Sequence, residues 1–130
     1  MDTRKKIIKP DEAAGVARRI LEGGKALRLV SGYFDPLLAE HSRRLAAIRR
    51  HGASLIAVIA TPARPVLGAQ ARAELVAALE VVDYAVIPEN SDVEELLGNI
   101  PASEVIRLEE TDEDTTREWI NHVRNRQGAN

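Results

Sequence analysis

The stretch SGYFDPLLAEH, residues 31–41, holds side chains that could contact a phosphate group. Gly32 permits close backbone approach to a ligand or a positive φ angle, Asp35 and Glu40 are carboxylates, and His41 can donate a hydrogen bond. His41 falls near the start of a predicted helix, where backbone N–H groups lack partners and the helix dipole is positive. The stretch therefore predicts a phosphate-facing loop that contains a histidine.

Apolar segments and helical patterns alternate on both sides of this stretch and must position it. The clearest strand is the unbroken apolar run SLIAVIA, residues 54–60, which is typical of a strand buried on both faces. Pro10 and Asp11 mark the start of a first helix, and Gly23 and Gly24 mark its end. We predict further strands over residues 26–31, 83–88 and 104–108, and helices over 11–23, 43–51, 69–80, 92–97 and 114–126.

This alternation predicts an α/β fold of the Rossmann-like, three-layer type. A parallel sheet of about four to five strands would carry helices on both faces, joined by right-handed crossovers. We interpret residues 1–130 as a single domain, because the chain is long enough for one core and too short for two of ordinary size. Ligands of such sheets bind beyond the carboxyl ends of the strands, where strand order reverses. Residues 31–41 follow the first predicted strand and are expected to border that place.

Composition excludes several classes of function. The chain is 45% hydrophobic and 29% charged, which is typical of a soluble globular protein. A formal net charge of -2 gives no basic field that would attract nucleic acid. The chain has no cysteine, which excludes a disulfide framework, a thiolate metal site and a cysteine nucleophile. No segment approaches the roughly 20 apolar residues of a membrane span, and the N-terminal residues lack a signal-peptide pattern, so we expect a cytoplasmic protein.

The same stretch resembles the pattern (N/S)-G-x-F-D-x-L-H-x-G-H of the cytidylyltransferase-like nucleotidyltransferases. The segment RPVLGAQARAELVAALEVVDYAVI, residues 64–87, is similar to the family's R-P-V segment, its Ala-Leu helix and its following strand. The similarity covers residues 5–90 and is greatest to the adenylyltransferase domain of bifunctional ADP-heptose synthases. The matching positions of the first pattern are Ser31, Gly32, Phe34, Asp35, Leu37 and His41.

The resemblance implies an enzyme that transfers a nucleotidyl group from ATP or CTP to a sugar or polyol phosphate, with Mg²⁺ and with release of pyrophosphate. Its partners would be a nucleotide, a small phosphorylated substrate and a second copy of the chain in a homodimer, with neither nucleic acid nor membrane. His41 would be catalytic, since the family's histidines bind the phosphates and stabilise the charge that builds during attack. The nucleotide-binding residues implied are Ser31, Gly32, Tyr33, Phe34, Asp35, Arg64, Arg72, Thr115 and Thr116, with no protein ligand to a metal.

Two residues depart from the family pattern within its H-x-G-H part, which carries the phosphate-binding histidines. Leu38 stands in place of the first histidine and donates no hydrogen bond, and losing one such donor lowers rates by on the order of 10² to 10³. Glu40 stands in place of the glycine, and a carboxylate about 4 Å from a phosphate charge is repelled by roughly 1 kcal/mol in water. The family's Lys-Gly segment before R-P-V and its later K-G-G-D-Y segment are also missing. These departures weigh against efficient catalysis, and we expect Leu38→His with Glu40→Gly to tighten nucleotide binding.

Three functions therefore stay open: an active nucleotidyltransferase, a degenerate relative that binds a nucleotide or phosphate without turnover, and an interaction partner that retains the fold. Each candidate residue also has an ordinary structural role as its alternative. These roles are packing or helix capping for His41, a hydrogen bond to turn backbone for Asp35, surface charge for Arg64 and Arg72, and a helix cap for Thr115 and Thr116.

Overall fold

The sheet is five-stranded and entirely parallel, with the strand order β1-β4-β3-β2-β5. The computed structural model of this protein describes residues 2–109. Its longest strands pair at the centre of the sheet, and the outer strands are short. The strands are β1 (Ile7–Ile8), β2 (Leu27–Gly32), β3 (Ser54–Ile59), β4 (Tyr84–Val86) and β5 (Glu104–Arg107).

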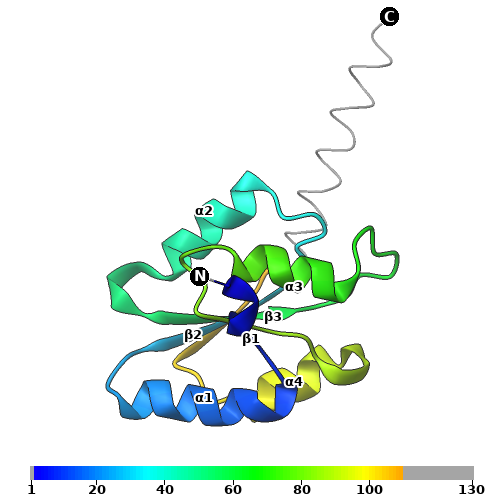
Figure 1. Cartoon of the computed structure of the whole chain (residues 1–130). Coiled ribbons are helices and arrows are strands. Elements are labelled where there is room, and N and C mark those ends of the chain that lie inside the picture. The colour runs from blue at the N-terminus through cyan, green and yellow to red at the C-terminus, as the bar shows by residue number, and fades with distance from the viewer. Residues whose placement is uncertain (1, 110–130) are drawn as a thin grey trace, which may run out of the picture.

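Helices cover both faces of the sheet, so the predicted three-layer α/β fold is confirmed. Helices α1 and α4 lie on one face, and α2 and α3 lie on the other (Figure 1). Within residues 2–109, no helix has the length and apolar character needed to cross a membrane. The α-helices are α1 (Pro10–Glu22), α2 (Ala39–Ile48), α3 (Ala69–Ala77) and α4 (Val93–Asn99), and the 3-10 turns are η1 (Thr3–Lys6), η2 (Arg50–Gly52) and η3 (Glu89–Ser91).

The sheet has a separate apolar cluster on each face, because successive side chains of a strand point to opposite sides. In β2, Leu29 packs with the α1 and α4 side, whereas the next residue, Val30, packs with the α2 and α3 side. In β3, Ile56 and Ala57 divide in the same way. Burial on both faces explains why β3 is an unbroken apolar run in the sequence.

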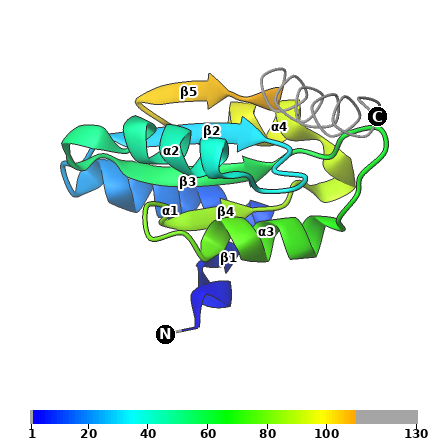
Figure 2. The same cartoon turned by 90° about the horizontal axis from the view of Figure 1, so that it is seen from above.

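Strand order reverses at β2, and the loops after β2 and β3 lie side by side because these two strands are parallel neighbours. The chain runs from β2 through α2 to β3 and through α3 to β4, and then α4 returns it to β5 on the far side of β2. Both loops lie at the carboxyl edge of the sheet (Figure 2). The loop that carries residues 31–41 follows the second strand rather than the first, because the dipeptide Ile7–Ile8 pairs with β4.

Several predicted boundaries change in the structure. The helix predicted from Arg43 begins at Ala39, four residues earlier, and ends at Ile48 before a 3-10 turn. The helix predicted to reach Glu80 ends at Ala77. The final helix predicted over residues 114–126 lies outside the described residues.

Candidate functional site

The loop after β2 makes a sharp turn around a buried aromatic ring. Phe34 is fully buried in the cluster under α2 and α3 and adopts a left-handed backbone conformation with φ of 49°. The Asp35-Pro36 peptide bond is cis. Gly32 ends β2 and is not among the residues with positive φ, which leaves close backbone approach as its expected role. The left-handed backbone falls at Phe34 instead. The loop is thus anchored by Phe34 before it enters α2.

Asp35 bonds the loop after β2 to the loop after β3. Its carboxylate oxygens accept hydrogen bonds from the backbone N–H groups of Val66, at 2.6 Å, and of Leu67, at 2.7 Å. The side chain is 8% exposed, so these are charge-assisted bonds in a partly desolvated place. The contacts agree with the structural alternative for Asp35, although the backbone it holds belongs to the neighbouring loop rather than to its own turn.

Arg72 is a buried cation, which overturns its interpretation as an exposed helix residue. It is 1% exposed, and its Nε donates to the carbonyl of Leu67 at 3.0 Å. One terminal nitrogen donates to the carbonyls of Tyr33 and Ala60, and the other donates to the hydroxyl of Thr61 at 3.1 Å. Burial lowers the pKa of the guanidinium, and the nearby carboxylate of Asp35 opposes that shift.

Arg72 therefore joins three segments of the carboxyl edge: the loop after β2, the end of β3 and the turn before α3. It holds the carbonyl of Leu67 while Asp35 holds the N–H of the same residue. Sequence patterns did not predict this network. The available signal was Thr61 directly after a buried strand, followed eleven positions later by the arginine.

His41 lies inside the first turn of α2 and is 1% exposed. Its Nδ1 accepts a hydrogen bond from the backbone N–H of Leu38 at 2.8 Å, which caps the start of the helix. The ring also meets the edge of Phe34, with 5.6 Å between ring centroids. Because Nδ1 accepts, a neutral ring carries its proton on Nε2. The packing and capping role is thus present, and a phosphate contact by His41 stays a prediction.

Glu40 does not present an unopposed negative charge at the start of α2. Its carboxylate bonds to Arg43 at 3.0 Å and to Arg44 at 3.2 Å. The hydrogen bond from Arg43 lowers the pKa of Glu40, and its charge and that of Arg44 act in the same direction. Two guanidinium groups on one carboxylate leave a net positive charge. The repulsion of phosphate expected from the sequence is therefore offset locally.

The remaining predicted site residues differ in exposure. Ser31 is fully buried, and its hydroxyl has no hydrogen-bond partner within residues 2–109. Tyr33 is half-buried and contributes its carbonyl to Arg72. Arg64 is exposed at the tip of the loop after β3. Thr115 and Thr116 lie outside the described residues.

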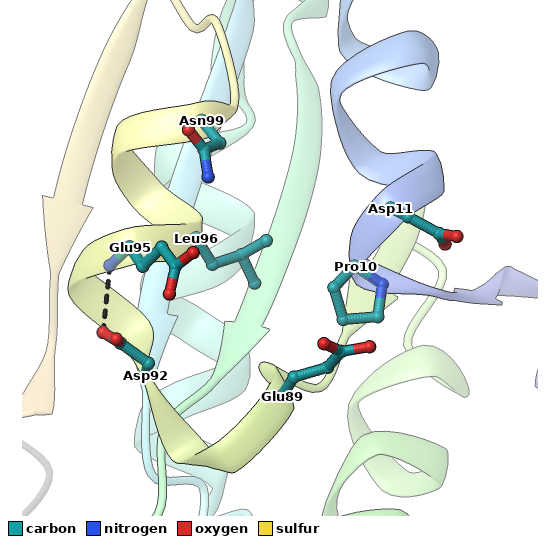
Figure 3. A pocket seen from close by; sticks show the side chains of 7 residues that line it. All are labelled: Pro10, Asp11, Glu89, Asp92, Glu95, Leu96 and Asn99. Carbon is teal, nitrogen blue, oxygen red and sulfur yellow. Dashed lines mark hydrogen bonds between the residues drawn. The ribbon is translucent and has the colours of Figure 1, made fainter.

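Two cavities lie away from these residues. One, of about 220 Å³, is found between the start of α1 and the segment η3 to α4, and its lining includes the carboxylates of Asp11, Glu89, Asp92 and Glu95 (Figure 3). The other, of about 880 Å³, is beside the start of β4 and is lined by cations and carboxylates together. Neither cavity is lined by a predicted site residue. The acidic lining of the first disfavours a triphosphate.

Comparison with known proteins defines the fold of this chain. No protein-family model and no curated protein sequence matches it. A solved structure, the lipopolysaccharide core biosynthesis protein from Thermoplasma volcanium GSS1, is similar with a TM-score of 0.53 and 17% sequence identity. The match covers 63% of this chain and 94% of that chain. At this identity the likeness establishes a shared α/β fold.

Proposed function

We propose that this protein is nucleotidyltransferase-like and binds a nucleoside triphosphate, ATP or CTP, at the carboxyl edge of β2 and β3. The observation that carries the proposal is the first turn of α2. The bond from Leu38 holds the His41 ring in a fixed orientation, next to the strand at which strand order reverses. The loop just before this turn is bonded through Asp35 to the loop after β3. Ala39 and Glu40 occupy the first two positions of α2, where backbone N–H groups have no partner inside a helix and favour anions.

The reaction supported by the sequence resemblance is nucleotidyl transfer to a sugar or polyol phosphate. An oxygen of the acceptor phosphate forms a bond to the α-phosphorus while the bond to pyrophosphate breaks. His41 would donate from Nε2 to a phosphate oxygen, because its Nδ1 is already engaged with Leu38. No covalent intermediate with the protein is required, so positioning and electrostatic stabilisation supply the catalysis.

Mg²⁺ would enter this site together with the triphosphate. Among residues 2–109, no three carboxylates or histidines converge to form a metal cage, and the Asp35 carboxylate is bonded to backbone amides. Mg²⁺ commonly binds substrate phosphates and keeps several waters, so phosphate oxygens can supply its ligands. When bound, the ion would neutralise phosphate charge.

A second candidate function is nucleotide binding without efficient turnover, and one observation favours it. Leu38 is the N-cap residue of α2, and its side chain makes no capping hydrogen bond. An apolar side chain at this position cannot stabilise charge on the reacting phosphate. One missing donor lowers rates by on the order of 10² to 10³, so binding could persist while transfer becomes slow.

A calorimetric titration with ATP and CTP, with and without Mg²⁺, paired with a pyrophosphate-release assay, separates these functions. Binding with pyrophosphate release across sugar and polyol phosphates supports the transferase, and binding alone supports the second candidate. No heat at millimolar nucleotide contradicts both and leaves a protein that retains the fold as an interaction partner.

A further inference from the structure

The loop after β3, residues 61–68, is held mostly through its backbone, with one further contact at the hydroxyl of Thr61. Val66 is 76% exposed, and Arg64 and Pro65 are exposed beside it. Here the apolar side chain faces solvent, while its own N–H makes a 2.6 Å bond to Asp35.

Two nearly buried charged side chains hold this backbone. Asp35 accepts from the backbone N–H groups of Val66 and Leu67, and Arg72 donates to the carbonyl of Leu67. Arg72 also donates to the side-chain hydroxyl of Thr61. Burying charges is costly, and well-packed apolar residues often stabilise a fold equally well. What the buried charges add is restriction of the backbone, because four hydrogen bonds made by Asp35 and Arg72 fix the path of the loop. Its tip is thereby presented outward in one conformation.

We infer that Asp35 and Arg72 are positioning residues that fix residues 61–67 as a ligand-facing wall, so that Arg64 and Val66 contact the ligand. The contacting side chains are a cation and an apolar group, separated by one proline. They suit a ligand with a phosphoryl group. That group can belong to the nucleotide or to a phosphorylated acceptor, and the ligand part of this inference rests on the proposed function.

The first part of the test uses the ligand-free protein. Amide hydrogen exchange is measured in wild type, Asp35→Asn, Arg72→Met and the milder Thr61→Val. An asparagine can accept at its oxygen but not at its nitrogen, so Asp35→Asn should raise exchange at Val66 or Leu67 by about tenfold or more. Exchange in β3, at Ile56 and Val58, should stay unchanged. If Arg72→Met does not fold, Asp35→Asn and Thr61→Val decide this part.

Asp83→Asn is the matched control. The carboxylate of Asp83 also accepts a backbone N–H, that of Leu55 at 2.8 Å, but it lies at the opposite end of β3. This variant should leave exchange at Val66 and Leu67 unchanged. Equal effects of Asp35→Asn on the loop and on β3 would show a general loss of stability and overturn the positioning role, as would no effect on the loop.

The second part titrates ATP and, separately, glycerol 3-phosphate into the same variants with Arg64→Ala. We expect Arg64→Ala and Asp35→Asn each to weaken one of these ligands by about tenfold. The two losses should not add in the double variant, because Asp35 acts through the tip that carries Arg64. The ligand that responds identifies the source of the phosphoryl group.

Additive losses would show that Asp35 acts independently of Arg64 and would overturn the inference. If neither ligand binds wild type, the proposed function and the ligand part of this inference both fail. The exchange measurement then still decides whether Asp35 and Arg72 position the loop.

Discussion

Carboxylates gather at two places in this molecule, and they are used differently. At the carboxyl edge, Asp35 is 8% exposed and bonds two backbone amides of a neighbouring loop. In the cavity between α1 and α4, Asp11, Glu89 and Glu95 are exposed, and Asp92 caps its own helix through the N–H of Glu95 (Figure 3). The cavity contains more carboxylates, but only the carboxylate at the carboxyl edge bonds the backbone of a different loop.

This difference indicates which of the two regions has its backbone fixed in advance for binding a ligand. A single buried carboxylate with satisfied bonds restricts the conformation of two loops, whereas several exposed carboxylates restrict little beyond one helix start. The buried group also has a buried cation beside it, Arg72, which compensates its charge. We therefore assign the candidate site to the carboxyl edge rather than to the hollow that contains more titratable groups.

Removing the buried cation should have the largest effect on stability. Arg72→Met leaves the carboxylate of Asp35 without its nearby cation and several acceptors without donors. Each buried acceptor left without a donor costs about 1 to 3 kcal/mol, so we expect a total loss of about 3 to 5 kcal/mol. Urea denaturation measures this difference in the free energy of unfolding.

Glu95→Gln in the acidic cavity is the contrasting variant, because Glu95 is exposed and its backbone rather than its side chain is engaged with Asp92. Its effect should stay within about 0.5 kcal/mol. If Arg72→Met and Glu95→Gln lower the free energy of unfolding by similar amounts, the proposed difference between the two regions is wrong.

Restoring the missing donor should have the next largest effect. Leu38→His places an imidazole at the N-cap of α2, where the proposed transfer reaction would otherwise have no hydrogen-bond donor. We expect pyrophosphate release to rise by on the order of 10²-fold. Adding Glu40→Gly should give little more, since Arg43 and Arg44 already offset that carboxylate. A larger gain from the glycine than from the histidine would contradict this account.

The smallest expected effect concerns the exposed ion pairs of Glu40. The hydrogen bond from Arg43 holds the folded pKa of Glu40 below the ordinary value of a glutamate side chain. A lowered folded pKa contributes stability above the unfolded pKa, and that contribution is lost as the pH falls through the folded pKa. Glu40→Gln should therefore destabilise the protein slightly at neutral pH and less in acid. Thermal unfolding across pH measures it, and a difference that grows in acid would contradict the assignment.

The sequence predicted the layers of the fold better than the contacts of the site. Unbroken apolar runs such as Ser54–Ile59 report burial on both faces directly, so β3 was predicted almost to the residue. The dipeptide Ile7–Ile8 was missed because two residues show no period, and its pairing with β4 depends on the folded sheet.

Site residues were harder to interpret because their partners are distant in sequence. Arg72 reads as a surface charge on a helix, and only the fold brings Tyr33 and Ala60 to it. For Asp35, the structural alternative was a hydrogen bond to the backbone of its own turn, but the amides that it bonds lie more than thirty positions away. Local patterns define which side chains are polar, and tertiary structure decides which backbone they hold.

The most direct test of the central claim compares two histidine variants in a calorimetric titration with ATP and Mg²⁺. His41→Asn keeps an acceptor for the N–H of Leu38 but removes Nε2, and His51→Asn changes an exposed histidine whose φ of 69° asparagine tolerates. We predict that His41→Asn weakens ATP binding by about tenfold or more and that His51→Asn leaves it unchanged. Equal affinity in wild type and His41→Asn would contradict a phosphate site at the start of α2.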